Sequence, residues 1–133
     1  MVATTHARVR ARHQQGQATI ELALALPIVI VVILGVVETA LLAGDQLRLS
    51  HAAREAARVA VVDPDPDVPK RTIDDQGFAG AVVRITPAST ERIQGKPLTV
   101  AVTYRRPSRV PVIGRVFDGL ELQARATMRI EQP

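Results

Sequence analysis

The chain has 133 residues, which is enough for one modest soluble domain, and its 2% of aromatic residues leaves mainly Val, Leu, Ile and Ala to build a core. It has no cysteine, which excludes disulfides, thiolate catalysis and cysteine-based metal sites. The formal net charge is +4. Arg8, Arg10 and Arg12 all precede Gly16, and without these three the chain has 14 basic and 13 acidic residues. A charge excess held in a leader indicates membrane topology and argues against a direct nucleic-acid partner.

The first half of the chain predicts a basic leader and one long helix. Residues 1–16 are polar, basic and free of acids, so we expect a cytoplasmic leader there. Residues 17–43 are almost uncharged and close to the roughly 20 residues that cross a bilayer, which predicts a transmembrane helix. Glu38 follows Glu21 by about 25 Å along such a helix, so we expect it to be a solvated carboxylate at the outer interface.

The helix is expected to continue outside the membrane over residues 44–62, where the pattern becomes amphipathic. One side of this extracytoplasmic continuation is polar, and the other carries small residues, mostly alanine. A continuous helix over residues 17–62 would span roughly 70 Å, so its outer half needs a packing partner. Residues 63–78 are expected to be an Asp/Pro-rich linker, because three closely spaced prolines remove backbone donors and stop the helix.

The remaining residues, 79–133, predict a small β domain. Residues 120–131 alternate strictly between apolar and polar side chains, which is the strongest strand signal in the chain. Residues 98–105 alternate in the same way, and residues 79–86 form a weaker third candidate. The expected fold class is therefore α+β, with a long N-terminal helix and a small antiparallel sheet packed on its outer half.

One short motif stands at the start of the apolar run. Gly16 ends the basic segment, and Glu21 follows five residues later as the lone charge before a long apolar stretch. This pattern resembles the signal of type IV prepilins, in which a prepilin peptidase cuts after the glycine. The resemblance implies cleavage between Gly16 and Gln17 and a role for Glu21 in subunit assembly. From the residues alone, Glu21 is also explained as an acid that stabilises a helix N-terminus.

A longer resemblance covers residues 16–60. Glu21, Pro27 and the AAREAAR segment at residues 52–58, together with the ending ARATMRIE, are similar to the TadE-like family of tight-adherence pilus systems. The family implies a pilin-like fold and a minor pilin or pseudopilin function. Its partners would be the prepilin peptidase, the inner-membrane pilus platform, other minor pilins or the major pilin, and membrane lipid. Pro27 would also free a backbone carbonyl and bend the helix.

Other functions find little support in the sequence. Phosphate loops, dinucleotide fingerprints and nucleophile elbows are missing, and the three histidines have no metal-ligand spacing, so we expect no enzyme activity, cofactor or metal. Arginines before the span predict a single-pass membrane protein with a cytoplasmic N-terminus and an extracytoplasmic C-terminal domain, incorporated in a pilus in some settings. The alternative is an unprocessed signal-anchored envelope protein with a small extracytoplasmic binding domain.

Overall fold

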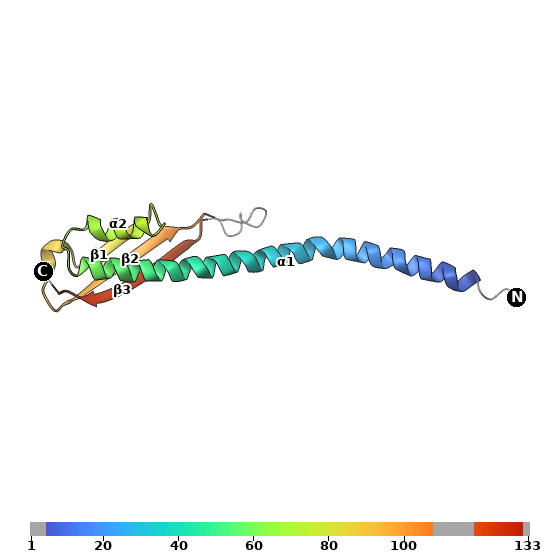
Figure 1. The fold of residues 1–133 in the computed structure, drawn as a ribbon, viewed down its shortest axis with the longest axis horizontal. Helices are drawn as coiled ribbons and strands as arrows, with labels where there is room; N and C mark the ends of the chain where they lie inside the picture. The colour runs from blue at the N-terminus through green and yellow to red at the C-terminus, as the bar shows by residue number, and fades with distance from the viewer. Residues whose placement is uncertain (1–4, 108–118, 132–133) are drawn as a thin grey trace. The chain divides into compact units, whose positions relative to one another are not determined.

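The computed structural model describes the backbone of residues 5–107 and 119–131, and the side chains of residues 16–107 and 119–131. Figure 1 shows its elements, which follow in the order α1, α2, β1, a short 3-10 turn at Ser89–Glu91, β2 and β3. The chain comprises two compact units, Met1–Val37 and Glu38–Pro133. The fold class is α+β, as the sequence predicted.

Helix α1 (Thr5–Ala60) runs through the first part of the chain. The helix was expected to begin at Gln17, but it begins at Thr5, so part of the leader is helical as well. This difference has a local cause, because residues 5–15 are rich in alanine, arginine and glutamine, which are good helix formers, and contain no proline or glycine. The helix ends at Ala60, shortly before Pro64, as the proline-rich segment predicted.

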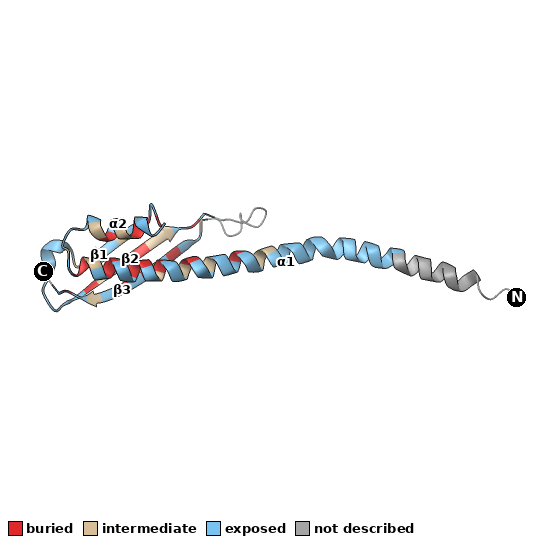
Figure 2. Cartoon of the chain, viewed as in Figure 1, coloured by how far each residue is buried: buried red, intermediate tan, exposed pale blue. Residues whose placement is uncertain are grey.

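The second half of α1 packs on the sheet through small side chains. Its buried positions recur at helical spacing and have no exposed area at Ala52, Ala53, Ala56 and Ala57. Alanine side chains let the helix backbone approach the sheet closely, which gives the dense packing of a protein interior. Figure 2 shows burial along this half of the helix, facing the buried residues of the sheet.

Three antiparallel strands form the sheet: β1 (Val82–Thr86), β2 (Pro97–Arg105) and β3 (Glu121–Arg129), in the order β1-β2-β3. All three expected strands are confirmed, and both long ones alternate as predicted. The inner face contributes to the same core as α1. Its buried members are Leu98, Val100, Val102, Leu122, Ala124 and Ala126.

A second helix, α2 (Asp67–Asp75), lies where the sequence predicted only a linker. Pro66 takes the N-cap position with φ −66°, and Pro69 lies in the first turn, where backbone N–H groups have no intrahelical acceptor anyway. The prolines that stop α1 therefore begin a new helix at no cost in hydrogen bonds. Pro69 and Ile73 are buried, and Ile73 belongs to the same core as the alanine face of α1. Burial of these two side chains holds α2 on the inner side of the sheet.

A tight turn ends α2 and orients the next aromatic side chain. Gly77 has φ +91°, a left-handed conformation that glycine adopts readily, and the N–H of Phe78 donates to the carbonyl of Ile73 at 3.3 Å. Phe78 is buried and meets Tyr104 edge to face, with ring centroids 5.2 Å apart. Phe78 and Tyr104 are the two aromatic side chains that the core cluster includes among the described residues.

Candidate functional site

The apolar stretch of α1 in the first unit is exposed over most of its length. Every described residue from Gly16 to Ile33 is exposed, and Leu24, Ile28 and Val36 expose 71%, 67% and 65% of their surface. Figure 2 shows this stretch as continuously exposed. Soluble proteins rarely leave a contiguous apolar surface of this extent in water. Among the described residues, α1 is the one helix long and apolar enough to cross a membrane, with a mean hydropathy of 2.9 in its 18-residue window. This fits a single-pass membrane anchor.

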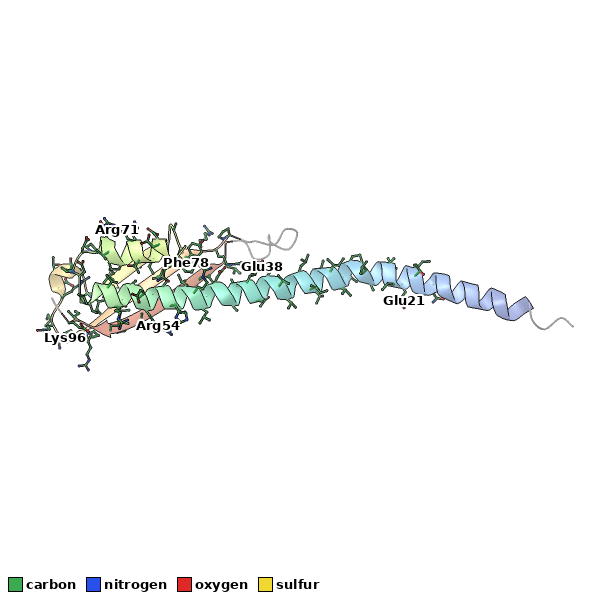
Figure 3. All side chains as sticks on the ribbon, viewed as in Figure 1. Glu21, Glu38, Arg54, Arg71, Phe78 and Lys96 are labelled. Atoms are coloured by element: carbon green, nitrogen blue, oxygen red, sulfur yellow. The ribbon has the colours of Figure 1, made fainter. Side chains whose placement is uncertain are left out.

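Gly16, Gln17 and Glu21 all lie exposed on this helix, and Figure 3 labels Glu21. Gln17 and Glu21 are four residues apart, so their side chains share one face of α1. A Cβ placed on Gly16 would meet nothing within 4 Å. The structure therefore gives Gly16 no packing reason to be glycine, and a small side chain would fit there without disturbing the fold.

Pro27 lies inside α1, where it has no N–H to donate. The carbonyl of Ala23, four residues earlier, therefore has no partner at that position of the helical ladder. The bend that this would produce stays a prediction.

The sequence reasoning missed a buried ion cluster that joins α1 to the sheet. Arg106 directly follows β2, and its Nη1 donates to Oε1 of Glu38 at 2.5 Å, while its Nε donates to Oδ2 of Asp45 at 2.7 Å. Glu38 has no exposed area, Asp45 exposes 5% and Arg106 exposes 1%. Arg48 lies at the rim, with Nη1 at 3.9 Å from Oδ1 of Asp45 and a largely exposed side chain.

The expectation for Glu38 was wrong in one respect. It was predicted to be a solvated carboxylate at an interface, but the protein buries it in a charge pair. The reason is that Glu38 and Asp45 are seven residues apart, two helical turns, and so point from the same face of α1. That spacing was readable in the sequence, whereas the arginine that meets both acids lies 68 and 61 residues further along the chain.

The electrostatics of this cluster depend on both acids. Burial is the largest single effect on the pKa of Arg106 and lowers it, but hydrogen bonds and charge attraction from Glu38 and Asp45 together raise that pKa above its ordinary value. Arg106 is therefore charged at any physiological pH. Among the described residues, Oε2 of Glu38 and Nη2 of Arg106 are buried without a hydrogen-bond partner. The three charge contacts of the cluster therefore have to offset the free-energy cost of removing these groups from water.

A second arginine closes the other end of the helix. Arg92 is 7% exposed, and its Nη1 donates to the carbonyls of Ala60 and Asp63 at 2.8 and 3.0 Å. The last carbonyls of a helix have no intrahelical donor, and a cation there also meets the negative end of the helix dipole. Arg92 and Arg106 thus fasten the two ends of the packed half of α1.

One surface groove, of about 770 Å³, runs beside this half of α1. Its lining mixes charges of both signs, with Arg54, Arg58, Glu55 and Glu131 among them. Within residues 5–107 and 119–131, no group of three or more His, Asp or Glu side chains is placed to hold a metal ion.

Comparison with known proteins adds one finding. Residues 16–58 match the family described as TadE-like protein. No curated protein and no solved structure matches the chain significantly. The matched residues include Gly16, Glu21, Pro27, Glu38 and the alanine face of α1, so both the exposed stretch and the helical half of the ion cluster lie in the family region. Residues 16–58 are thus a TadE-like segment, which confirms the resemblance that the sequence showed from Gly16 onward.

Proposed function

We propose that this chain is a minor pilin- or pseudopilin-like subunit in tight-adherence pilus biogenesis, and that a prepilin peptidase processes it between Gly16 and Gln17. The TadE-like segment indicates a pilus-associated protein. The exposed apolar stretch supports a membrane anchor, for which we propose residues 17–43, with Glu38 at its outer end, where the second unit begins and Arg106 pairs with it. The small sheet and the packed half of α1 would then form the extracytoplasmic part, residues 44–133.

The observation that carries this proposal is the position of Glu21. It is the one charged residue between Gly16 and Val37, and it lies exposed on an apolar helix surface. A carboxylate in or near hydrocarbon is costly, so an acid placed there is a functional candidate by default. Cleavage before Gln17 would create an amine one helical turn from Glu21. That amine, or the amine of a neighbouring subunit, would neutralise the carboxylate and set the register of assembly.

The proposed topology follows from the charges on each side of the anchor. Arg8, Arg10 and Arg12 precede it, which favours a cytoplasmic N-terminus and an extracytoplasmic C-terminal domain. In this orientation the leader would meet the prepilin peptidase at the inner face of the membrane. The other proposed partners are the inner-membrane pilus platform and further pilins, and the role is structural.

One observation favours the alternative of an unprocessed signal-anchored envelope protein. Gly16 and Gln17 lie within α1, where helical hydrogen bonds cover the backbone. A peptidase would have to unwind this turn before it could reach the peptide bond. An uncleaved chain would keep the whole helix and use its extracytoplasmic domain to bind another envelope component.

Intact mass of the membrane-extracted full chain, produced with and without the cognate prepilin peptidase, separates the two functions. We expect a mature chain that starts at Gln17 in the presence of the peptidase and a full-length chain in its absence. An uncleaved leader under both conditions, with a known prepilin cleaved in the same cells, would rule out processing and leave the signal-anchor alternative.

A further inference from the structure

The outer face of the sheet, the face turned away from α1 and α2, carries a concentrated positive charge. Its side chains come from alternate positions of the three strands, and those that carry charge are four arginines and a single glutamate. Four threonines and one alanine fill much of the rest of this face. The charged residues are Arg84, Arg105, Arg125, Arg129 and Glu121.

The strand register arranges these side chains in rows across the sheet. Arg84 pairs with Ala101, and Ala101 pairs with Arg125, so one row holds two arginines on either side of a methyl group. Arg105 pairs with Glu121 at one end of the face, where the charges offset each other. Among the described residues, Arg84, Arg125 and Arg129 make no ion pair within 4.0 Å. The row Arg84–Ala101–Arg125 therefore presents two positive charges without an acidic partner in the described part of the chain, on either side of the small Ala101 side chain.

The opposite side of the same unit carries one acidic segment, whereas the exposed side of α1 there carries Arg48, Arg54 and Arg58 with Glu55. Residues 63–75, which include α2, contain five aspartates against Lys70 and Arg71. Asp65, Asp67 and Asp75 are exposed. Ile73 anchors this segment on the inner side of the sheet, so its outward surface faces away from the basic outer face. The unit thus has a basic sheet face and, on its other side, an acidic segment at residues 63–75.

We propose that the outer face of the sheet binds the acidic segment, residues 63–75, of a second copy of this chain. The charge on the two surfaces is complementary, and because they lie on opposite sides of one unit, the contact is heterologous and continues from copy to copy. Such an array keeps every copy in the same orientation. All copies need a common orientation if they are anchored in one membrane. This argument from orientation, and no other part of the inference, rests on the proposed anchor.

A two-fold contact between sheet edges would fit this protein less well. Pairing the outer edge of β3 with β3 of a second copy in the antiparallel direction would reverse the packed half of α1 between the two copies. It would also displace Gln46, which donates to the carbonyl of Gln123 on that edge at 2.7 Å. A contact between the basic face and the acidic segment has no such conflict.

Cysteine crosslinking of the full chain in membranes tests the contact directly, because the chain has no cysteine of its own. One tagged copy carries Ala101→Cys on the outer face, and a second, differently tagged copy carries Lys70→Cys on α2. A short bismaleimide should join them. The matched control replaces Lys70→Cys by Leu47→Cys, another exposed position of the same unit, on α1 with 60% exposure. Equal crosslinking of the two pairs would overturn the proposal.

Charge reversal and rescue then test its cause. Either Arg84→Glu with Arg125→Glu, or Asp67→Lys with Asp75→Lys, should lower the crosslink by about tenfold, since each exposed charge pair changes association by a factor of roughly two to five. Mixing the two reversed copies should restore it. Arg54→Glu with Arg58→Glu, on the groove beside α1, is the control that should leave it unchanged.

Other results would overturn the proposal in distinguishable ways. Reversals without effect, or no rescue on mixing, would exclude a charge-driven contact between copies. Recruitment of anionic phospholipid vesicles by the full chain held in nanodiscs of neutral lipid, lost with Arg84→Glu and Arg125→Glu while copies do not crosslink, would assign the basic face to a lipid surface instead. Crosslinking is measured without the peptidase, so failure of leader cleavage would contradict the proposed function and leave this inference standing.

Discussion

Arg106 and Glu38 meet at 2.5 Å across 68 residues of chain, and both side chains are buried. Their contact fastens the residue after β2 to the point on α1 where the second unit begins. Asp45, two turns further along α1, accepts the second hydrogen bond of the same guanidinium. One arginine therefore holds two helical acids and fixes how the helix lies on the sheet.

Removing the arginine should destabilise the second unit strongly. Arg106→Ala leaves Glu38 buried without its cation, and breaking a buried pair in this way costs about 3–5 kcal/mol. Thermal or denaturant unfolding of the detergent-solubilised full chain measures the loss. Arg84→Ala, an exposed arginine on the outer face, is the control and should change the free energy of unfolding by less than about 0.5 kcal/mol. Equal stability of the two variants would contradict a structural role for Arg106.

Replacing both partners should cost less than replacing one. Arg106→Met alone leaves a buried carboxylate, whereas Glu38→Met with Arg106→Met fills the same space with apolar groups. We expect the double variant to be more stable than Arg106→Met by about 1–3 kcal/mol, although it carries one more substitution. Asp45 keeps Arg48 as a nearby cation, at 3.9 Å. The measurement is a double-mutant cycle on the free energy of unfolding, and additive losses would show that the pair is not coupled.

The alanine face of α1 should not accept larger side chains. Ala56 has no exposed area, so Ala56→Leu would force the helix away from the sheet and cost about 1–3 kcal/mol. Ala43→Leu makes the same chemical change at an exposed position of the same helix and should be near neutral. Unfolding curves of both variants measure the difference. A stable Ala56→Leu variant would mean that the helix does not lie closely on the sheet.

Processing should depend on Gly16 for recognition and not for folding. A Cβ at Gly16 meets nothing within 4 Å, so Gly16→Ala should leave the unfolding transition of the chain unchanged. We expect it nevertheless to block cleavage before Gln17, measured by intact mass in cells that contain the peptidase. Gly35→Ala, which also meets nothing within 4 Å, is the matched control and should be cleaved normally. Normal cleavage of Gly16→Ala would contradict the proposed signal.

Assembly should depend on the charge of Glu21. Glu21→Gln removes a carboxylate from an apolar helix surface, so membrane insertion should be unchanged or improved. We expect the same variant to reduce co-isolation with other pilus subunits by tenfold or more (about 1.4 kcal/mol). Glu55→Gln, at an exposed position on the packed half of α1, is the control. Unimpaired co-isolation of Glu21→Gln would contradict a role for Glu21 in assembly.

The sequence by itself determined the elements with strong local periodicity. The apolar run of α1 and the strict alternation in β2 and β3 each depend on neighbouring residues, so pattern alone was sufficient to predict them. The spacing from Gly16 to Glu21 was readable for the same reason, and the family match at residues 16–58 covers it.

Only the tertiary structure decided the features that join distant segments. Helix α2 forms within a proline-rich segment because Pro69 and Ile73 find a core to bury in, which local propensity does not reveal. Glu38 is buried and not solvated, because Arg106 reaches it from the end of β2. The charge separation between the outer face of the sheet and residues 63–75 likewise exists only once strand register places Arg84 and Arg125 in one row. A linear sequence gives each charge, but the partner of a charge is set by how the chain folds back on itself.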